Sequence, residues 1–403
     1  MADTPQRPDR PATDRPASDR PVYVIGGGPG GLSVAYALRA RGLRAVVLEK
    51  SDRVGASWRR HYDRLHLHTT RRLSGLPGLP MPRRFGRWVA RDDVVRYLEK
   101  YAEYHDLEIV TGVEVSSVEP SPDGSGWLLH ATGGRELTGA AVVVATGHNH
   151  TPRLPDWPGR DTYRGELLHA GEYRDPAPYT GRDVLVVGVG NTGAEIAVDL
   201  VEGGAERVRL SVRTAPHIVR RSTAGWAAQF TSILVRRLPV GLVDRLARPV
   251  AKLSVPDLSA QGLPRPDTGL YSRVKEGAIP VLDVGLIDAV RKRRIEIVAA
   301  VDGFEDGKVV LADGTRVSPD AVIAATGYVR ALEDLVGHLD VLDERGKPVV
   351  QGARTPAGAP GLYFTGFTNP ISGNLREMAI DAQKIAKAVA GDRGRRVSRL
   401  PVT

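Results

Sequence analysis

The sequence predicts an α/β protein with two Rossmann-like dinucleotide-binding domains, the first of which is discontinuous because the second is inserted into it. One observation is a repeat: an apolar strand, a glycine-rich turn, a helix and a second strand occupy residues 22–49 and again residues 183–213. Another is that each copy is followed, about 120 to 140 residues after its glycine turn, by an apolar run ending in Ala-Thr-Gly. The length of 403 residues suits two or three domains.

Composition narrows the classes of function. The chain has no cysteine, which excludes disulfides, thiol nucleophiles, iron–sulfur clusters and cysteine-ligated zinc, so redox chemistry would need a bound organic cofactor. The net charge is +9 but aromatic residues are only 5%, so we expect anionic small molecules rather than nucleic acid as partners. No apolar run reaches the ~18 residues of a membrane span, and no leader is recognisable. We therefore expect a cytoplasmic protein without stable membrane association.

The first repeat follows a tail, residues 1–20, whose mixture of proline and charge predicts disorder. A buried strand at 22–25 leads into the turn, a helix follows at 32–41 with Gly42 as its C-cap, and the next strand, 45–48, ends at Glu49. The turn itself consists of Gly26, Gly27, Gly28, Pro29, Gly30 and Gly31.

The second repeat has a strand at 183–187, a helix at 194–201 and a strand from 207 to 212 that ends at Arg213. Its turn consists of Gly188, Val189, Gly190, Asn191, Thr192 and Gly193. Beyond the second Ala-Thr-Gly, a strand at 362–366 and a helix at 375–390 are expected to return to the first domain. The predicted division is therefore 21–150 plus 328–392 for the first domain and 151–327 for the second, with a basic tail at 393–403.

Each glycine turn has a mechanical purpose. The first glycine permits the sharp exit from the strand, the second lets the backbone approach a pyrophosphate, and the third lets the helix pack closely on the strand. The helix N-terminus then offers free N–H groups to the anion. Such a turn alone is a weak signal, whereas two copies in the same strand–turn–helix context make a plain tight turn a poor explanation.

The residue that ends the second strand distinguishes the two sites. Glu49 lies 18 positions after Gly31, where a carboxylate accepts hydrogen bonds from ribose hydroxyls and favours FAD. Arg213 lies 20 positions after Gly193, where a guanidinium would pair with a 2′-phosphate and favours NADPH. The alternative for Arg213 is a solvated surface arginine. The remaining cofactor-binding residues that we predict are Lys50, Trp58, Val115, Gly147, His169 and Gly366.

Several of these residues also have structural interpretations. His169 either contacts the nicotinamide ribose or supports the interdomain linker, and the structural role is the commoner one for a lone histidine. Trp58 either lies against the flavin or fills a core. Glu195 is interpreted as a first-turn acid favoured by the helix dipole, without a catalytic role. His66 and His68 would share one face of a strand, yet packing is favoured over a metal site, and no metal is expected.

A basic and apolar stretch at 230–253 has two interpretations. It is either an amphipathic element on a membrane surface or, as we favour because Pro239 and Pro249 interrupt it, a helical lid or substrate-pocket wall.

The linker between the repeats resembles a known signature. Tyr163, Gly165, His169 and Tyr173 match the aromatic-x-Gly-x-x-x-His-x-x-x-Tyr/Phe motif of class B flavin monooxygenases, except that the family usually has Phe at the first position. The chain is most similar to the YUCCA-type flavin monooxygenases and their bacterial relatives. The stretches that carry this resemblance are 57–58, 62–68, 188–196, 238–245, 280–285 and 325–328.

The resemblance implies an enzyme that uses FAD, NADPH and O₂ to insert one oxygen atom into a small organic substrate through a C4a-(hydro)peroxyflavin. It suggests an aryl-pyruvate such as indole-3-pyruvate. One departure is that many members have a Thr-Asn pair near the flavin, whereas His68-Thr69-Thr70 stands here, so no catalytic residue is assigned. The alternatives are an NADPH-dependent flavin reductase and a non-enzymatic dinucleotide sensor. The active site is expected where the domains meet, at the carboxyl ends of the parallel strands.

Overall fold

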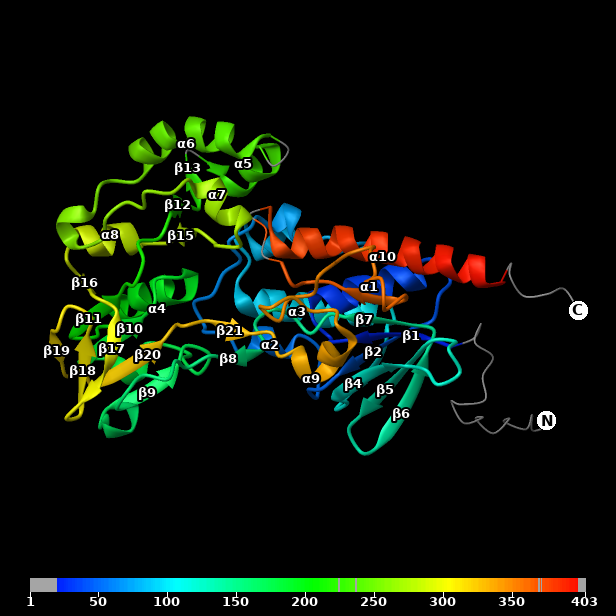
Figure 1. Ribbon diagram of the computed structural model, residues 1–403. Helices are drawn as coiled ribbons and strands as arrows, with labels where there is room; N and C mark the ends of the chain where they lie inside the picture. Colours follow the sequence, from blue (N-terminus) through cyan, green and yellow to red (C-terminus); the bar gives the residue numbers. More distant parts are fainter. Residues whose placement is uncertain (1–19, 224, 236–237, 369, 371, 398–403) are drawn as a thin grey trace, which may run out of the picture.

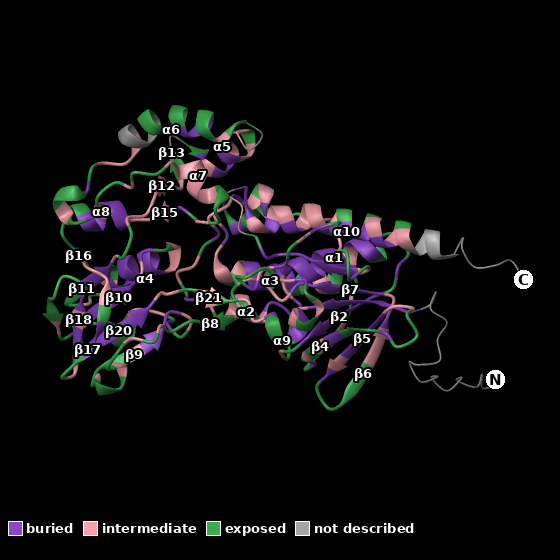
Figure 2. Ribbon diagram, viewed as in Figure 1, coloured by how far each residue is buried: buried purple, intermediate pink, exposed green. Residues whose placement is uncertain are grey.

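The computed structural model describes residues 20–223, 225–235, 238–368, 370 and 372–397, which form two lobes joined by a narrow connection (Figure 1). Each lobe is built on a five-stranded sheet. The strands of both sheets are rich in Val, Ile, Leu and Ala and almost wholly buried at the centre, as parallel strands covered on both faces must be (Figure 2).

The first sheet contains only parallel pairs, and its central strand β1 is flanked by β2 and β7. Its order is β22 (Leu362–Phe364), β7 (Ala141–Val144), β1 (Val22–Ile25), β2 (Ala45–Glu49) and β3 (Glu108–Thr111). Strand β22 comes from the end of the chain, so this sheet is completed only after the second lobe has been traversed. Helices α1 (Pro29–Arg39), α3 (Arg91–Tyr104) and α10 (Asn374–Val397) belong to this lobe.

The second sheet repeats the first, with the central strand β10 flanked by β11 and β20. Its order is β16 (Ile295–Val298), β11 (Arg207–Ser211), β10 (Asp183–Val187), β20 (Ala321–Ala324) and β9 (Glu166–His169). Helices α4 (Asn191–Glu202) and α8 (Leu286–Arg291) pack in this lobe. In each sheet, the strand before the glycine turn therefore lies between the strand after the helix and the strand that ends in Ala-Thr-Gly.

Each lobe also carries a small antiparallel sheet, which extends the internal repeat. In the first lobe it consists of β4 (Val115–Pro120), β5 (Trp127–Ala131) and β6 (Arg135–Gly139). In the second it consists of β17 (Val301–Glu305), β18 (Lys308–Leu311) and β19 (Arg316–Val317). Both precede the strand that ends in Ala-Thr-Gly.

Two antiparallel strands form the connection between the lobes, β8 (Thr151–Pro152) on the outward path and β21 (Tyr328–Val329) on the return. Their pairing brings the two crossing points of the chain side by side (Figure 1). Short elements near the connection are α2 (Ala56–Arg59) and α9 (Glu333–Val336).

A helical lobe, which we define as residues 217–283, projects from the second domain (Figure 1). Its elements are β12 (Ile218–Arg220), β13 (Ser222–Thr223), β14 (Trp226–Ala227), α5 (Ala228–Val235), α6 (Val240–Ser254), α7 (Leu270–Lys275) and β15 (Val281–Asp283). Pro249 lies inside α6 without ending it, so the prediction that proline interrupts the helix there is wrong.

Several boundaries differ from the sequence prediction. Residues 1–19 lie outside the described part, but Arg20, assigned to the tail, is buried and pairs with Asp123 at 2.9 Å. Helix α10 continues to Val397 instead of ending near residue 390, and residues 398–403 lie outside the described part. Helix α1 begins at Pro29, where the fixed φ of proline suits the first helical position.

Candidate active site

The first glycine turn leads from β1 into α1 at the carboxyl edge of the first sheet. Gly26 has a φ of +112°, and a Cβ there would lie 2.6 Å from the carbonyl oxygen of Ala145. A Cβ on Gly31 would lie 1.9 Å from the Gly26 oxygen, so helix and turn touch there. A Cβ on Gly28 would meet nothing within 4 Å. The turn therefore presents one open backbone position in front of the helix N-terminus, which is the shape that a pyrophosphate needs.

Glu49 lies against this turn, as predicted for a ribose-binding acid. Its side chain is buried, Oε2 accepts a hydrogen bond from the Gly27 amide at 2.6 Å, and Oε1 accepts one from the Ser51 amide at 2.9 Å. Each carboxylate oxygen keeps further lone pairs, so the group can still accept from ribose hydroxyls.

The other residues predicted for the first cofactor lie around the same edge. Lys50 is near Glu114, with Nζ 3.6 Å from Oε1, and the half-buried Val115 follows it at the start of β4. Gly147 and Gly366 follow β7 and β22 with φ of +84° and +86°. Trp58 is half-buried against the core of the first lobe, and its ring makes an edge-to-face contact with the His61 ring, with the two ring centroids 5.8 Å apart. These contacts favour the core-filling interpretation of Trp58.

The second glycine turn has the geometry of the first. Gly188 has a φ of +104°, with a Cβ position 2.7 Å from the Ala325 oxygen, and a Cβ on Gly193 would lie 2.0 Å from the Gly188 oxygen. A Cβ on Gly190 would again meet nothing within 4 Å. Val189 is buried beneath the turn. Each turn therefore has a glycine with a positive φ at the strand end, a glycine open to a ligand, and a glycine at which the helix touches the turn.

Asn191 and Thr192 open helix α4. The Asn191 amide nitrogen donates to the Pro280 oxygen at 3.1 Å, and its Oδ1 accepts from the Leu282 amide at 2.7 Å. The Asn191 side chain therefore fixes the segment that enters β15, a role that the motif alone does not reveal, and its contact with NADPH stays a prediction. Thr192 is half-buried beside it.

A pocket of about 470 Å³ lies in front of the second turn. Its wall contains Val189 and Gly190 from the turn, the loop 214–217 after β11, and residues of α7 and the segment after it. Arg213 is exposed and directly precedes that loop, and a second cation, Arg273, lines the pocket. Arg273 was not predicted from the sequence, because it lies far from the glycine motif in the chain. It lines the pocket because helix α7 packs beside the second turn.

His169 lies at the end of β9 and supports the connection between the lobes. Its Nε2 is 3.0 Å from the Gly327 oxygen, and its Nδ1 accepts from the Gly171 amide at 3.0 Å, so the proton is on Nε2. Burial lowers the pKa of His169, which keeps the ring neutral. These two backbone contacts favour the structural alternative for His169.

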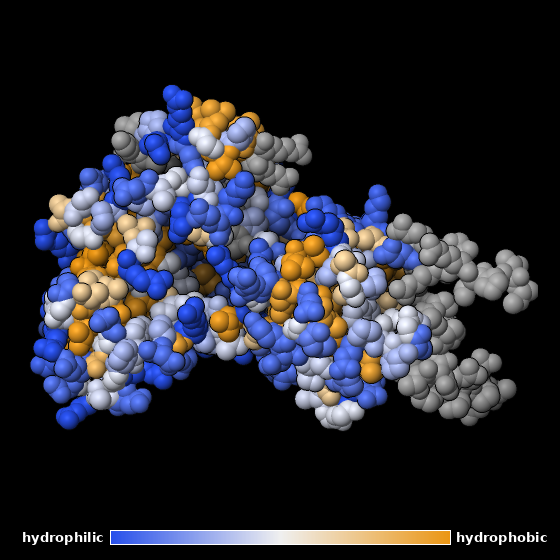
Figure 3. All heavy atoms as spheres, viewed as in Figure 1, coloured by the Kyte–Doolittle hydropathy of each residue, from blue (hydrophilic) through white to orange (hydrophobic). Residues whose placement is uncertain are grey.

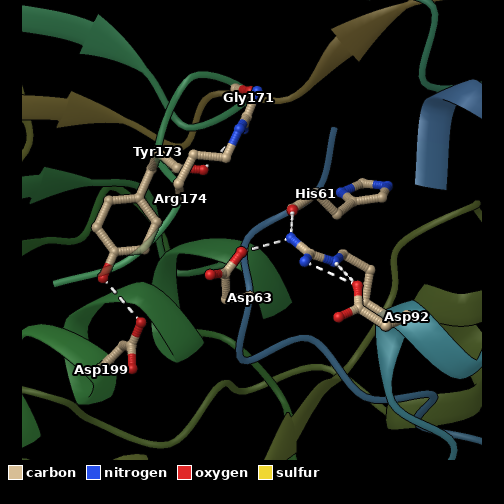
Figure 4. Close-up of polar contacts among 8 residues, drawn as sticks. His61, Asp63, Asp92, Gly171, Tyr173, Arg174 and Asp199 are labelled. Atoms are coloured by element: carbon tan, nitrogen blue, oxygen red, sulfur yellow. Dashed lines mark hydrogen bonds and ion pairs between the residues drawn. The ribbon is translucent and has the colours of Figure 1, made fainter. Parts of the chain in front are cut away.

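Residues 61–68 of the first lobe contact helix α4 and the linker between the two repeats. The Asp63 amide donates to the Arg174 oxygen at 2.8 Å. Tyr173 donates to Asp199 on α4 at 2.8 Å (Figure 4). Arg64 pairs with Asp199 at 3.5 Å and also with Glu202. The lobes are therefore joined by side chains as well as by the two crossing strands.

Glu195 of helix α4 lies at the centre of these contacts and is only 3% exposed. Its Oε2 accepts from the Tyr62 hydroxyl at 3.1 Å, and its Oε1 lies 2.8 Å from Nε2 of His68. Burial, followed by the nearby Glu195 carboxylate, raises the pKa of Tyr62 well above its usual value. Helix α4 has no acid in its first turn, so the first-turn interpretation of Glu195 is wrong, and its carboxylate instead joins α4 to the first lobe.

His61, in the same segment, is held neutral. Burial lowers its pKa to about 4, and the cations Arg174 and Arg91 add to the effect. Arg91 also fixes the backbone of this segment, because it donates to the His61 oxygen at 2.6 Å and to Asp63 at 2.5 Å (Figure 4). Across the described residues no group of three or more His, Cys, Asp or Glu side chains could hold a metal ion.

The fold and the two turns define a class of protein: an oxidoreductase with two dinucleotide-binding domains whose strand ends face a common junction. The chain matches the flavin-binding monooxygenase-like family over residues 19–339 and belongs to it. It is 35% identical over 370 residues to indole-3-pyruvate monooxygenase YUCCA1 of Oryza sativa, an alignment that covers 91% of this chain and 90% of that one.

Solved structures agree with this assignment. A flavin-containing monooxygenase from Stenotrophomonas maltophilia superposes with a TM-score of 0.70 at 25% identity, covering 93% of this chain and 98% of that one. The bacillithiol disulfide reductase of Bacillus cereus superposes with a TM-score of 0.66 at 19% identity, covering 93% and 99%, which shows the shared fold alone.

The protein is thus a flavin-dependent monooxygenase with FAD and NADPH as cofactors and with O₂ and a small molecule as its reactants. This finding favours the main sequence prediction over the flavin-reductase alternative. None of the described helices is both long enough and apolar enough to cross a membrane.

Proposed function

We propose that the enzyme oxidises an aryl-pyruvate, with indole-3-pyruvate as the first candidate, to the corresponding acetate. The observation that carries this proposal is the 35% identity, over nine-tenths of both chains, with a plant protein named as an indole-3-pyruvate monooxygenase. In the balanced reaction, the 2-oxo acid, O₂, NADPH and a proton give the shortened carboxylate, CO₂, NADP⁺ and water. The proposed location is the cytoplasm, where NADPH is available.

We propose that the FAD domain comprises residues 21–150 and 328–392 and that the NADPH domain comprises residues 151–327. The open backbone at Gly28 and the buried carboxylate of Glu49 support FAD at the first turn. The open backbone at Gly190, the pocket in front of it and the exposed Arg213 support NADPH at the second. The residues present therefore fit both cofactors.

When bound, the flavin supplies the two-electron reduction and the activation of oxygen. The chain supplies binding and orientation. The N-terminus of α1 and the N-terminus of α4 each stabilise a pyrophosphate through free amides and the helix dipole. The contacts of Tyr62 and His68 with Glu195 hold α4 against the first lobe. The nicotinamide and flavin sites therefore keep a fixed separation. The buried side chains of Tyr62 and Glu195 help to keep water, which would otherwise divert the reaction, out of this part of the junction.

The test uses the purified holoprotein with NADPH, ¹⁸O₂ and a panel of aryl-pyruvates, amines, sulfides and ketones. We expect an aryl-pyruvate to stimulate NADPH oxidation and to yield an acetate that carries one labelled oxygen atom. Labelled product from an amine, sulfide or ketone but from no aryl-pyruvate would overturn the substrate assignment. NADPH oxidation without label in any product would instead favour electron transfer to another acceptor.

A further inference from the structure

The outer face of the helical lobe exposes large apolar side chains. Trp226 is 59% exposed, Leu234 77%, Leu238 47%, Leu242 48% and Leu246 62%. They are five of the eleven exposed large hydrophobic side chains in the described part of the chain. Figure 3 shows hydrophobic surface gathered at the end of this lobe, over α5 and α6. Exposed apolar clusters of this kind mark contact surfaces on soluble proteins.

The four leucines recur at every fourth residue along α5, the short link after it and α6. On α6, Leu242 and Leu246 are exposed, whereas Val243, between them in the sequence, is buried. The exposure of these leucines favours an amphipathic surface element over a substrate-pocket wall, although the lid or pocket wall was the favoured interpretation of this stretch. The start of α5 faces inward, where Oε1 of Gln229 accepts from the Thr70 amide at 2.9 Å and its Nε2 donates to the Ser372 oxygen at 2.7 Å.

The same stretch is strongly basic. Residues 217–256 contain seven arginines and lysines and a single carboxylate, Asp244. Asp244 is buried and accepts hydrogen bonds from the amides of Tyr271 and Ser272 at 2.7 and 3.0 Å, so it does not reach the outer face. Arg245 and Arg248 are exposed beside the outward leucines. The outer face thus combines apolar side chains with cations and offers no carboxylate of its own from this stretch.

We propose that this outer face, defined by Trp226, Leu234, Leu238, Leu242 and Leu246 with Arg245 and Arg248, docks reversibly on the surface of an anionic lipid bilayer. Lipid headgroups supply the negative charge that complements the arginines, and the acyl boundary accepts the leucines. Trp226 suits the headgroup level, where tryptophan is enriched. A second copy of the chain fits less well, because a two-fold interface would bring two copies of this basic face together.

The contact is peripheral and reversible, because one amphipathic surface of this size holds a protein only weakly. It is independent of the cofactor and substrate assignments, since none of the proposed surface residues belongs to a glycine turn or lines the pocket in front of the second turn. It qualifies the sequence-based expectation of no stable membrane association without requiring a membrane span.

The experiment measures co-sedimentation of the holoprotein with vesicles of phosphatidylcholine mixed with phosphatidylglycerol, and with vesicles of phosphatidylcholine alone. We expect binding to the mixed vesicles at low salt, weaker binding at high salt because counterions screen the arginines, and little binding to phosphatidylcholine alone. The double substitution Leu234→Ser with Leu246→Ser is expected to weaken binding about tenfold or more, since both side chains lose their burial in the acyl boundary.

A matched control removes exposed apolar side chains elsewhere, by Tyr104→Ser with Val349→Ser, which are 61% and 51% exposed. It is expected to bind as the unmodified protein does. Arg245→Gln with Arg248→Gln is expected to weaken binding to the mixed vesicles about tenfold. Unchanged FAD content in each variant shows that folding is intact.

Failure of the holoprotein to sediment with mixed vesicles at low salt overturns the proposal. Equal binding to both kinds of vesicle overturns the anionic-lipid assignment. A vesicle-free dimer that dissociates in the Leu234→Ser and Leu246→Ser variant would show that a second copy, rather than lipid, occupies this face.

Discussion

The two glycine turns make a prediction in which each substitution should affect one cofactor and spare the other. Gly28→Ala and Gly190→Ala each add a methyl group at a position where the structure leaves open space and where φ is not positive. Neither change should disturb the folded chain. Each methyl group would, however, occupy the place from which the backbone approaches a pyrophosphate.

The size of the effect follows from the contacts that would be lost. A methyl group displaces the phosphate by roughly 1 Å or more and so lengthens one or two charge-assisted hydrogen bonds, each contributing about 1.5 kcal/mol or more. The expected loss of affinity is therefore about 10- to 100-fold. In contrast, Gly193→Ala would place its Cβ 2.0 Å from the Gly188 oxygen, and overpacking of this kind should lower the free energy of unfolding by about 3 kcal/mol.

The assay combines FAD titration of the apoprotein, NADPH binding to the holoprotein and urea unfolding. Gly28→Ala should lose FAD affinity, and Gly190→Ala should lose NADPH affinity while retaining FAD. Gly358→Ala, whose Cβ would also meet nothing within 4 Å, is the control and should change neither. If Gly28→Ala bound FAD as tightly as the unmodified protein, or if Gly190→Ala lost FAD rather than NADPH, the assignment of the turns would be refuted.

Three further predictions concern single side chains. Arg213→Ala should raise the KM for NADPH about 10- to 100-fold and leave that for NADH nearly unchanged, because only NADPH carries the 2′-phosphate; Arg291→Ala is the control, and equal effects on both nucleotides would count against the assignment. Glu195→Ala should lower the free energy of unfolding by about 2–3 kcal/mol, because it removes the acceptor of the buried Tyr62 hydroxyl and the carboxylate that lies 2.8 Å from His68 Nε2. Glu195→Gln should cost less in urea unfolding, and a loss as large as that of alanine would argue against this contact. Because His61 has a folded-state pKa of about 4, the unfolded chain takes up the proton at a higher pH than the folded chain does. The free energy of unfolding should therefore fall as the pH drops from 6.5 to 4, by at most about 3 kcal/mol. His61→Gln should make the free energy of unfolding depend less on pH in that range, and an unchanged slope would contradict the pKa.

The parts of the molecule that could be predicted are those determined by residues close together in the sequence. An apolar strand, a glycine that must take a positive φ and a helix that follows it are all written within a few residues, and both sheets formed around the strands predicted for them. Glu49 lies beside the turn as expected, because its distance from the turn is fixed by one helix and one strand, and its contact with FAD stays a prediction. The YUCCA-type resemblance was confirmed by the family and by the plant relatives.

The parts that were missed depend on contacts between distant segments. Glu195 follows the second turn in sequence, but its partners Tyr62 and His68 lie more than 120 residues earlier, so its burial could not be read from its neighbours. Asn191 resembles a ligand-binding motif residue but holds the segment at Pro280. The leucines of α6 have a helical period that predicts an amphipathic helix, yet the period does not say whether the apolar side faces a pocket or the outside.

The measurement that tests the central claim most directly is anaerobic mixing of the purified protein with NADPH, followed by oxygen. The account predicts a yellow protein that retains FAD, that is bleached by NADPH far faster than by NADH, and that recovers its colour when oxygen is admitted. A colourless protein that does not take up added FAD in its folded state would contradict it, as would a yellow protein that NADPH does not reduce.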